Sequence, residues 1–145
     1  MSTRTDIRNA IGAALTGAGV VVTANLLKGR NNTIASVSFP SAAVYAVNEQ
    51  IEIRTLSPSN RDQYRQLQVM VEYFTSEATP VVTIIDDLFD TGSAAVESAV
   101  LADVTLGGKC RDLHLTNVEY VIEPDEDRRW GVARHTFNCI YLTTD

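Results

Sequence analysis

Two stretches with alternating side-chain character most constrain the fold of this chain. Residues 65–75 read RQLQVMVEYFT and place one alternating set on one side: Leu67, Val69, Val71 and Tyr73. Residues 134–145 read RHTFNCIYLTTD and do the same with His135, Phe137, Cys139 and Tyr141. A period of two is typical of a strand with one face on a core. The sequence therefore predicts two long strands, one of them closing the sequence.

Two helical regions are predicted beside these strands. The first begins after a cap at Ser2 or Thr3 and ends at Gly17 and Gly19, and its apolar stripe recurs at helical spacing in Ile7, Ala10, Ile11, Ala14 and Leu15. The second begins at Thr79-Pro80 and ends at Gly107-Gly108. Gly92 interrupts it, which leaves open one kinked helix or two helices.

The remaining segments complete the element order. Residues 42–56 and 113–122 alternate like strands, with Asn48–Gln50 expected to turn the chain and a bulge expected at Thr116-Asn117. Three polar segments are predicted loops: KGRNNT (28–33), SPSNRDQ (57–63) and EPDEDRRWG (123–131). VVVTANLL (20–27) fits strand or helix. The order predicts one α+β domain over residues 1–145, with two main α-helices packed on one face of an antiparallel (mixed) β-sheet.

Composition supports a single globular domain and limits the classes of function. The chain has 145 residues, 45% apolar and 21% charged, and no apolar run long enough for a membrane span. Asp6 and Asn9 interrupt the apolar pattern that a signal peptide needs, so secretion is not expected. A formal net charge of −6 disfavours general nucleic-acid binding.

Charge is spread unevenly along the sequence. Residues 1–65 carry seven basic and four acidic side chains, a net of +3, and the rest of the chain carries a net of −9. Such asymmetry suits head-to-tail contact between copies, or it reflects scattered solvated charge. A local basic patch formed by Arg54, Arg61 and Arg65 is a further possibility.

The residues that could carry chemistry are few. His135 and Cys139 share a strand face but lie about 13 Å apart along it, too far for a nucleophile and its base. With Cys110 and His114 they are the only cysteines and histidines, which is poor support for a metal site. We expect both cysteines to pack in the core and His135 to be partly exposed.

The acidic run IIDDLFD is the other candidate for chemistry. Asp86 and Asp90 are four apart, so they would be neighbours on a helix. Paired-carboxylate catalysis also needs a cleft and a raised pKa, which nothing in the sequence indicates, and no phosphate-binding glycine motif is present. We therefore expect a solvated helix face, no enzyme activity, no metal and no cofactor.

The order and texture of these elements resemble the tail terminator (tail completion) proteins of long-tailed bacteriophages. The resemblance rests on TRTDIRNAIGAAL, RQLQVMVEYFT, IIDDLFDTGSAAVESAVL, LHLTNVEYVIEPD and a closing strand in which Phe137, Tyr141 and Thr143 match the family's chain end. It covers most of the chain and is clearest from Arg65 onward. The segment from Val20 to Phe39 and the break at Gly92 depart from the family pattern.

The resemblance implies a structural virion protein rather than an enzyme. Such proteins form a ring, usually a homohexamer, at the head-proximal end of the tail tube, where they stop polymerisation and present a surface to the head-tail connector or head-completion protein. The implied partners are further copies, the tail tube protein and the connector, with DNA only as cargo through the lumen and no membrane. The implied location is the neck of the virion, after assembly in the host cytoplasm.

Loops on a rigid sheet are where contact surfaces usually lie. The candidate interface residues are Lys28, Arg30, Asn31, Asn32, Arg54, Arg61, Asp62, Arg65, Asp125, Glu126, Asp127, Arg128, Arg129 and Trp130. Trp130, next to two arginines, is the expected anchor of the last loop or else a cover for the open end of the core.

Three other functions remain open. The first is another ring component of the same machine, a head-tail connector or a tail tube subunit. The second is a small α+β enzyme that uses Asp86, Asp90 and His135. The third is a ligand-binding module that stays monomeric at every concentration.

Overall fold

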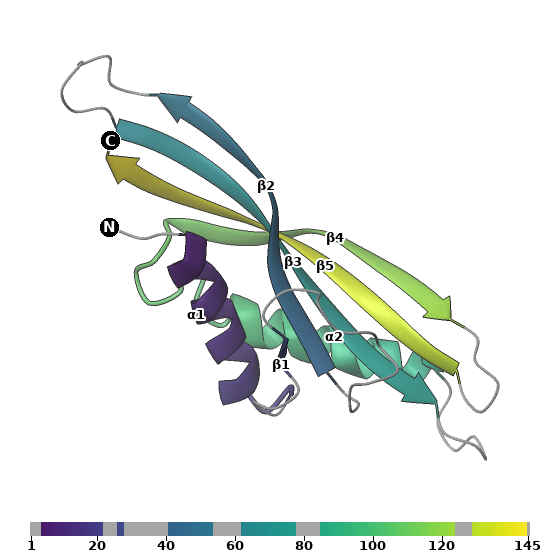
Figure 1. Cartoon of the computed structure of the whole chain (residues 1–145). Coiled ribbons are helices and arrows are strands. Elements are labelled where there is room, and N and C mark those ends of the chain that lie inside the picture. Colours follow the sequence, from purple (N-terminus) through teal and green to yellow (C-terminus); the bar gives the residue numbers. More distant parts are fainter. Residues whose placement is uncertain are drawn as a thin grey trace.

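Seven elements follow one another in the computed structural model of the chain (Figure 1). They are α1 (Arg4–Gly17), β1 (Leu26–Leu27), β2 (Ser41–Ile53), β3 (Asp62–Glu77), α2 (Ile85–Leu101), β4 (Asp112–Glu123) and β5 (Arg129–Thr144). The structure describes residues 4–21, 26–27, 41–53, 62–77, 85–123 and 129–144. None of the helices in these segments is long and apolar enough to cross a membrane.

The strands form one sheet in the order β1-β2-β3-β5-β4. The four long strands are antiparallel to their neighbours, and the short β1 adds a parallel pair at Ala42 and Ala43 of β2. The closing strand β5 lies between β3 and β4, so the last long strand of the sequence is an inner one. The outer long strands are β2 and β4. The predicted mixed, mainly antiparallel sheet is confirmed.

Both helices cover the same face of the sheet (Figure 1). Ile7, Ile11 and Leu15 of α1 are fully buried, and α2 contributes Val96 and Val100. They pack on the alternating residues that the sequence singled out, Val69 and Val71 of β3 and Phe137, Cys139 and Tyr141 of β5. The α+β architecture with two helices on one face therefore agrees with the sequence prediction.

The first helix ends where the glycines predict. Val20 donates its backbone N–H to Leu15 O at 3.0 Å, and Gly19 donates to Thr16 O at 3.1 Å. Gly19 has φ +75°, the left-handed conformation that closes a helix in this way. Val21, just beyond, is buried in the core.

The expected turn at Asn48–Gln50 is wrong, because β2 continues through it to Ile53. The pairing shifts between Ala46 and Asn48, so the irregularity is a β-bulge at Val47 rather than a turn. Pairing with β3 along the whole strand outweighs the turn propensity of the polar residues. The bulge predicted at Thr116-Asn117 is confirmed by a register shift between Leu115 and Asn117.

Gly92 does not break the second helix, which runs unbroken from Ile85 to Leu101. A Cβ built on Gly92 would lie 2.3 Å from Cε1 of Tyr73. The absence of a Cβ at Gly92 therefore allows α2 to lie close to the Tyr73 ring on β3. The predicted start at Thr79-Pro80 lies outside the described residues.

Candidate assembly surface

His135, one of the residues considered for catalysis, lies in the core. It is fully buried, so the expectation of a partly exposed histidine is wrong. Its Nε2 lies 2.8 Å from Ser93 Oγ, and Tyr120 donates its hydroxyl to the same Oγ at 3.3 Å. Burial lowers the pKa of His135, and its Nδ1 has no hydrogen-bond partner within the described part of the chain. The lowered pKa favours the neutral ring, and no described carboxylate bonds to Nδ1 in the way that the aspartate of a catalytic triad does.

The two cysteines lie together in the core, as expected. Cys110 and Cys139 are both buried. Hydrogen bonding between the two thiols, together with burial, raises the pKa of Cys139, while the same bond lowers the pKa of Cys110. Cys110 also donates to Val104 O at 3.4 Å. Within the described residues, no group of three or more His, Cys, Asp and Glu side chains is placed to hold a metal ion.

A groove of about 720 Å³ lies between the two helices. Its lining is mostly alanine and glycine from both helices, together with Ser98 and Asp103. The pKa of Asp103 is lowered, first by a hydrogen bond from Thr105 and then by backbone N–H groups of Gly107 and Thr105. The lowered pKa of Asp103 therefore reflects hydrogen bonds within a local turn. Asp90 is exposed on α2 while His135 is buried, and the Asp86 side chain lies outside the described residues.

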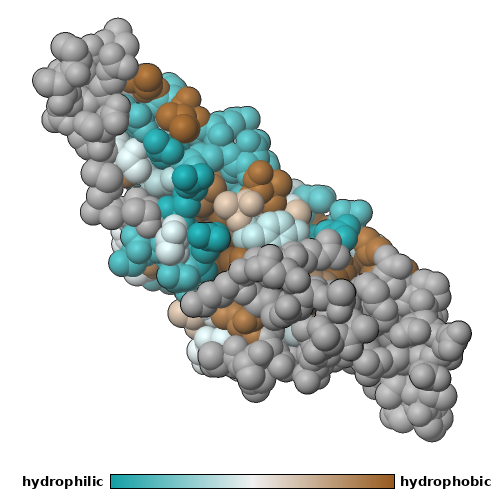
Figure 2. Space-filling view, viewed as in Figure 1, coloured by the Kyte–Doolittle hydropathy of each residue, from teal (hydrophilic) through white to brown (hydrophobic). Residues whose placement is uncertain are grey.

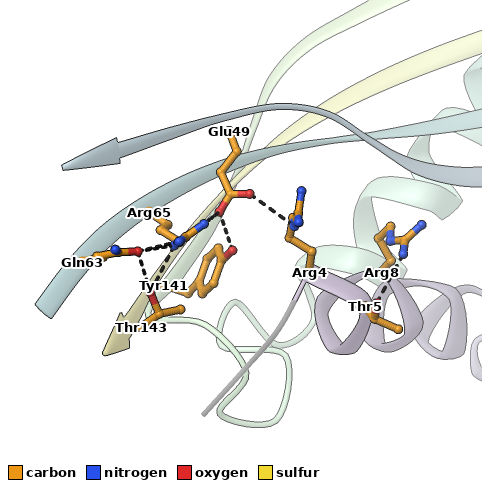
Figure 3. A network of polar contacts seen from close by, with 8 residues as sticks. All are labelled: Arg4, Thr5, Arg8, Glu49, Gln63, Arg65, Tyr141 and Thr143. Atoms are coloured by element: carbon orange, nitrogen blue, oxygen red, sulfur yellow. Dashed lines mark hydrogen bonds and ion pairs between the residues drawn. The ribbon is translucent and has the colours of Figure 1, made fainter. Parts of the chain in front are cut away.

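A polar network ties α1 to the sheet at one end of the molecule (Figure 3). Glu49 Oε1 accepts from Arg65 Nη1 at 2.9 Å and from the Tyr141 hydroxyl, and Oε2 lies 3.5 Å from Arg4 Nε. Burial alone would raise the pKa of Glu49, but the bonds from Arg65 and Tyr141 and the charges of Arg65 and Arg4 lower it overall. Burial and Glu49 together raise the pKa of Tyr141 to about 12. Arg65 is therefore part of the frame that holds this end together.

Three strands extend past the helix layer, from Arg65 and Tyr141 of this network onward (Figure 1). We call this part the projecting end; it comprises residues 51–53 of β2, 62–65 of β3 and 141–144 of β5. Ile51 and Ile53 are 53% and 46% exposed there, on the same side of the sheet as the helices. Figure 2 shows hydrophobic residues at the surface at this end of β2. Two neighbouring large apolar side chains exposed on one face of an edge strand make this end a candidate contact surface.

The connection between α2 and β4 forms a second surface, which we call the 102–111 connection. Asp103 Oδ1 accepts from Thr105 N at 3.0 Å and Oδ2 from Gly107 N at 2.8 Å. Leu106, Gly107 and Gly108 all have positive φ, so the turn is tightly wound. It holds Val104 at the surface, 42% exposed, and Lys109 and Arg111 of the same segment are also exposed.

The two outer long strands are open to a further partner. Among the described residues, no strand pairs with the outer side of β4, and none pairs with β2 beyond Ala43. Tyr120 and Ile122 are exposed on β4, at the opposite end from Asp112. The sheet thus carries exposed apolar side chains on both edges, which monomeric proteins usually avoid.

The face of the sheet opposite the helices is rich in amides. Asn48, Gln68 and Asn138 form one cross-strand row, with Gln50 and Gln66 in the next. These five side chains line a shallow depression of about 120 Å³. One buried ion pair lies on this face, since Arg134 Nε lies 3.1 Å from Glu72, which is fully buried and also accepts from Tyr45 at 2.6 Å. We call this surface the amide face.

The structure places only part of the interface predicted from sequence. Asp62 is exposed at the projecting end, whereas Arg65 is ion-paired with Glu49. The backbone of Arg129 and Trp130 belongs to β5, but their side chains lie outside the described residues, as do Lys28, Arg30, Asn31, Asn32, Arg54, Arg61 and Asp125–Arg128.

Sequence reasoning missed the exposure of Ile51 and Ile53. Ile51 and Ile53 alternate like core residues of a strand, so the pattern indicates burial. Their exposure follows from the length of β2, which extends past the helix layer, so that no described element covers these two side chains. Val104 and Lys109 fall in a turn region that carries no motif.

Comparisons with known proteins add little information on function. No protein-family model matches the chain, and no curated protein matches it. Among solved structures, the chain is similar to a chain of the virion of a native gene transfer agent particle, with 11% identity, a TM-score of 0.46, and coverage of 98% of this chain and 96% of that one. Such values are too low to carry an argument about function.

Proposed function

We propose that this protein is a structural subunit of a phage or phage-like tail, and specifically a tail terminator. It forms a homo-oligomeric ring, six copies in the full assembly, on the head-proximal end of the tail tube. The ring stops tube polymerisation and presents a surface to the head-tail connector or head-completion protein. It acts in the neck of the virion, after assembly in the host cytoplasm, and DNA passes through its lumen as cargo.

One observation carries this proposal: the sheet has two open outer strands, each with exposed apolar side chains. Ile51 and Ile53 on β2, and Tyr120 and Ile122 on β4, lie at opposite edges and opposite ends. Two different surfaces on one chain are what a heterologous contact needs, and such a contact gives a ring when its rotation closes. The sequence resemblance to tail terminators, argued from element order, agrees with this reading.

The strand directions support ring closure as well. With four antiparallel long strands, β2 and β4 run in opposite directions. A rotated copy therefore brings a β2 edge beside a β4 edge with the antiparallel alternation preserved. Six copies would place about 24 strands around the ring, a circumference of ~115 Å at about 4.8 Å per strand.

The helix layer decides which face points inward. In the described part of the chain both helices cover the same face, and the concave side of a ring has less room, so we place the helices outside and the amide face toward the lumen. Neutral amides and paired charges there offer passing DNA few free cations to hold its phosphates.

Tube assembly tests this proposal. The purified chain is added at increasing ratios to the tail tube protein encoded in the same genome, during polymerisation, and tube lengths are measured by electron microscopy. The proposal predicts shorter tubes with one closed end carrying the added protein. Incorporation along the tube would indicate a tube subunit, and unchanged tubes with a protein that stays monomeric would overturn the proposal in favour of a ligand-binding module.

A further inference from the structure

The two cysteines form a pair at the joint between the 102–111 connection and the sheet. Cys139 lies on the inner strand β5 and is fully buried in the core beneath the helices. Cys110 lies near the end of the connection, where the N–H of Arg111 donates to Ile140 O at 2.7 Å. This bond holds the backbone next to Cys110 against the backbone next to Cys139, and the two thiols are hydrogen-bonded to each other. The fold therefore brings together two sulfurs that are distant in the sequence.

The surroundings of the two thiols differ. Cys110 keeps 7% of its surface exposed, whereas Cys139 has none, and the backbone N–H of Cys110 donates to Thr105 O at 3.0 Å. The hydrogen bond between the thiols lowers the pKa of Cys110 and raises the pKa of Cys139, although burial and the carboxylates of Asp112 and Asp103 oppose the shift at Cys110. The more accessible thiol is thus also the one that more readily becomes a thiolate, which is the reactive form.

We propose that Cys110 and Cys139 are a redox-sensitive modification site, at which oxidation by hydrogen peroxide joins their sulfurs in an intrachain disulfide. The Cys110 thiolate attacks one peroxide oxygen, so the O–O bond breaks, a sulfenic acid forms on Cys110 and the first water leaves with the thiol proton. The Cys139 sulfur then attacks the Cys110 sulfur, so the S–S bond forms, the S–O bond breaks and the second water leaves with the Cys139 proton. Two thiols are oxidised, and one peroxide is reduced to two waters.

The disulfide fastens the 102–111 connection covalently to the inner strand β5. The cross-link joins two segments that are already in contact in the folded chain, so it restricts the unfolded chain more than the folded one. A reducing cytoplasm keeps such thiols free, and oxidising surroundings outside a cell favour the disulfide. This inference goes beyond the proposed function and does not depend on it, because it concerns a single chain.

Oxidation of the reduced, full-length chain under native conditions tests the site. Hydrogen peroxide is added in small excess, free thiols are counted after unfolding, and the intact mass is measured. We expect both thiols to be lost together, the mass to fall by two hydrogen atoms and peptide mapping to join Cys110 to Cys139. The urea midpoint of the oxidised chain should shift to higher urea, and dithiothreitol should reverse both changes.

Single variants separate the roles of the two sulfurs. In Cys139→Ala the sulfenic acid on Cys110 has no resolving thiol and should be trapped by dimedone, whereas Cys110→Ala should leave Cys139 reduced. Circular dichroism checks the fold of each variant, and the wild-type measurements decide the proposal if either variant fails to fold.

Three wild-type results would overturn the inference. They are thiols that stay reduced, disulfides that join two chains instead of closing within one, and an oxidised chain whose urea midpoint is unchanged or lower. None of these measurements needs a ring or a tail tube, so the inference and the proposed function stand or fall separately.

Discussion

At the scale of single residues, Gly92 shows how a position that reads as a helix breaker serves packing. Its Cα faces the Tyr73 ring so closely that an added Cβ would lie 2.3 Å from Cε1 and 2.8 Å from Cζ. The ring is held in the core by α2 and by its neighbours on β3. The helix therefore accepts the lower helix propensity of glycine in exchange for close contact with the sheet.

Gly92→Ala should destabilise the protein. Helix propensity favours alanine by about 1 kcal/mol, but forcing a methyl group into a packed site costs about 1–3 kcal/mol, so we expect a net loss. Urea unfolding measures the change. Gly17→Ala at the end of α1, where an added Cβ meets nothing within 4 Å, is the matched control and should be close to neutral. Equal or greater stability of Gly92→Ala would contradict the packing account.

His135 should make the stability of the protein depend on pH. Burial lowers its pKa below the usual 6.5, so below that pH the unfolded chain binds more protons than the folded chain. The free energy of unfolding should therefore fall as the pH drops from about 6.5 to 5, by at most ~1.4 kcal/mol per pH unit. Glu49, whose lowered pKa starts from 4.5, acts in a more acidic range.

The histidine variants separate this contribution from the rest of the chain. Urea unfolding at pH 7 and pH 5 should show a smaller difference in His135→Gln than in the wild type. His114→Gln, at the exposed second histidine, should keep the wild-type difference. An unchanged pH dependence in His135→Gln would show that another group is responsible.

At the scale of elements, the 102–111 connection is the most tightly wound part of the described chain. Gly108 has φ +87°, a conformation that costs other residues about 1–2 kcal/mol. Gly108→Ala should lower stability by about that amount and also weaken assembly, because the turn positions Val104 and Lys109. Urea unfolding and sedimentation velocity report the two effects. A variant with wild-type stability and full assembly would contradict the role given to this turn.

Local sequence patterns predict the helices and strands better than they predict which neighbours these elements contact. The stripe of Ile7, Ile11 and Leu15 and the alternation of Val69 and Val71 are properties of nearby residues, so helix and strands follow from the sequence. The path through Asn48–Gln50 depends on pairing with β3, which is distant in sequence and is not reflected in local turn propensity. The same applies to Gly92, whose role depends on Tyr73.

The candidate surfaces were still harder to predict from the sequence. The insertion of β5 between β3 and β4 decides which edges are open, and this is a long-range property. Ile51 and Ile53 alternate like buried residues, yet they lie beyond the helix layer. Arg65 reads as a surface cation and instead binds Glu49 in the polar network.

At the scale of the whole molecule, the sheet, its helix layer and its two open edges all bear on assembly. One face carries α1 and α2. The other carries a group of amides around Gln68 and, further along the strands, the buried apolar cluster of Ala43, Phe74 and Val132. Exposed apolar side chains lie on both outer long strands. We interpret these features together as those of a subunit that completes its packing only among copies of itself.

The mass of the purified chain in solution tests this account most directly. Light scattering across protein concentration and salt, alone and with tail tubes, should show a discrete species near six times the 15.8 kDa chain mass. A chain that stays monomeric under every condition, tubes included, would contradict the account.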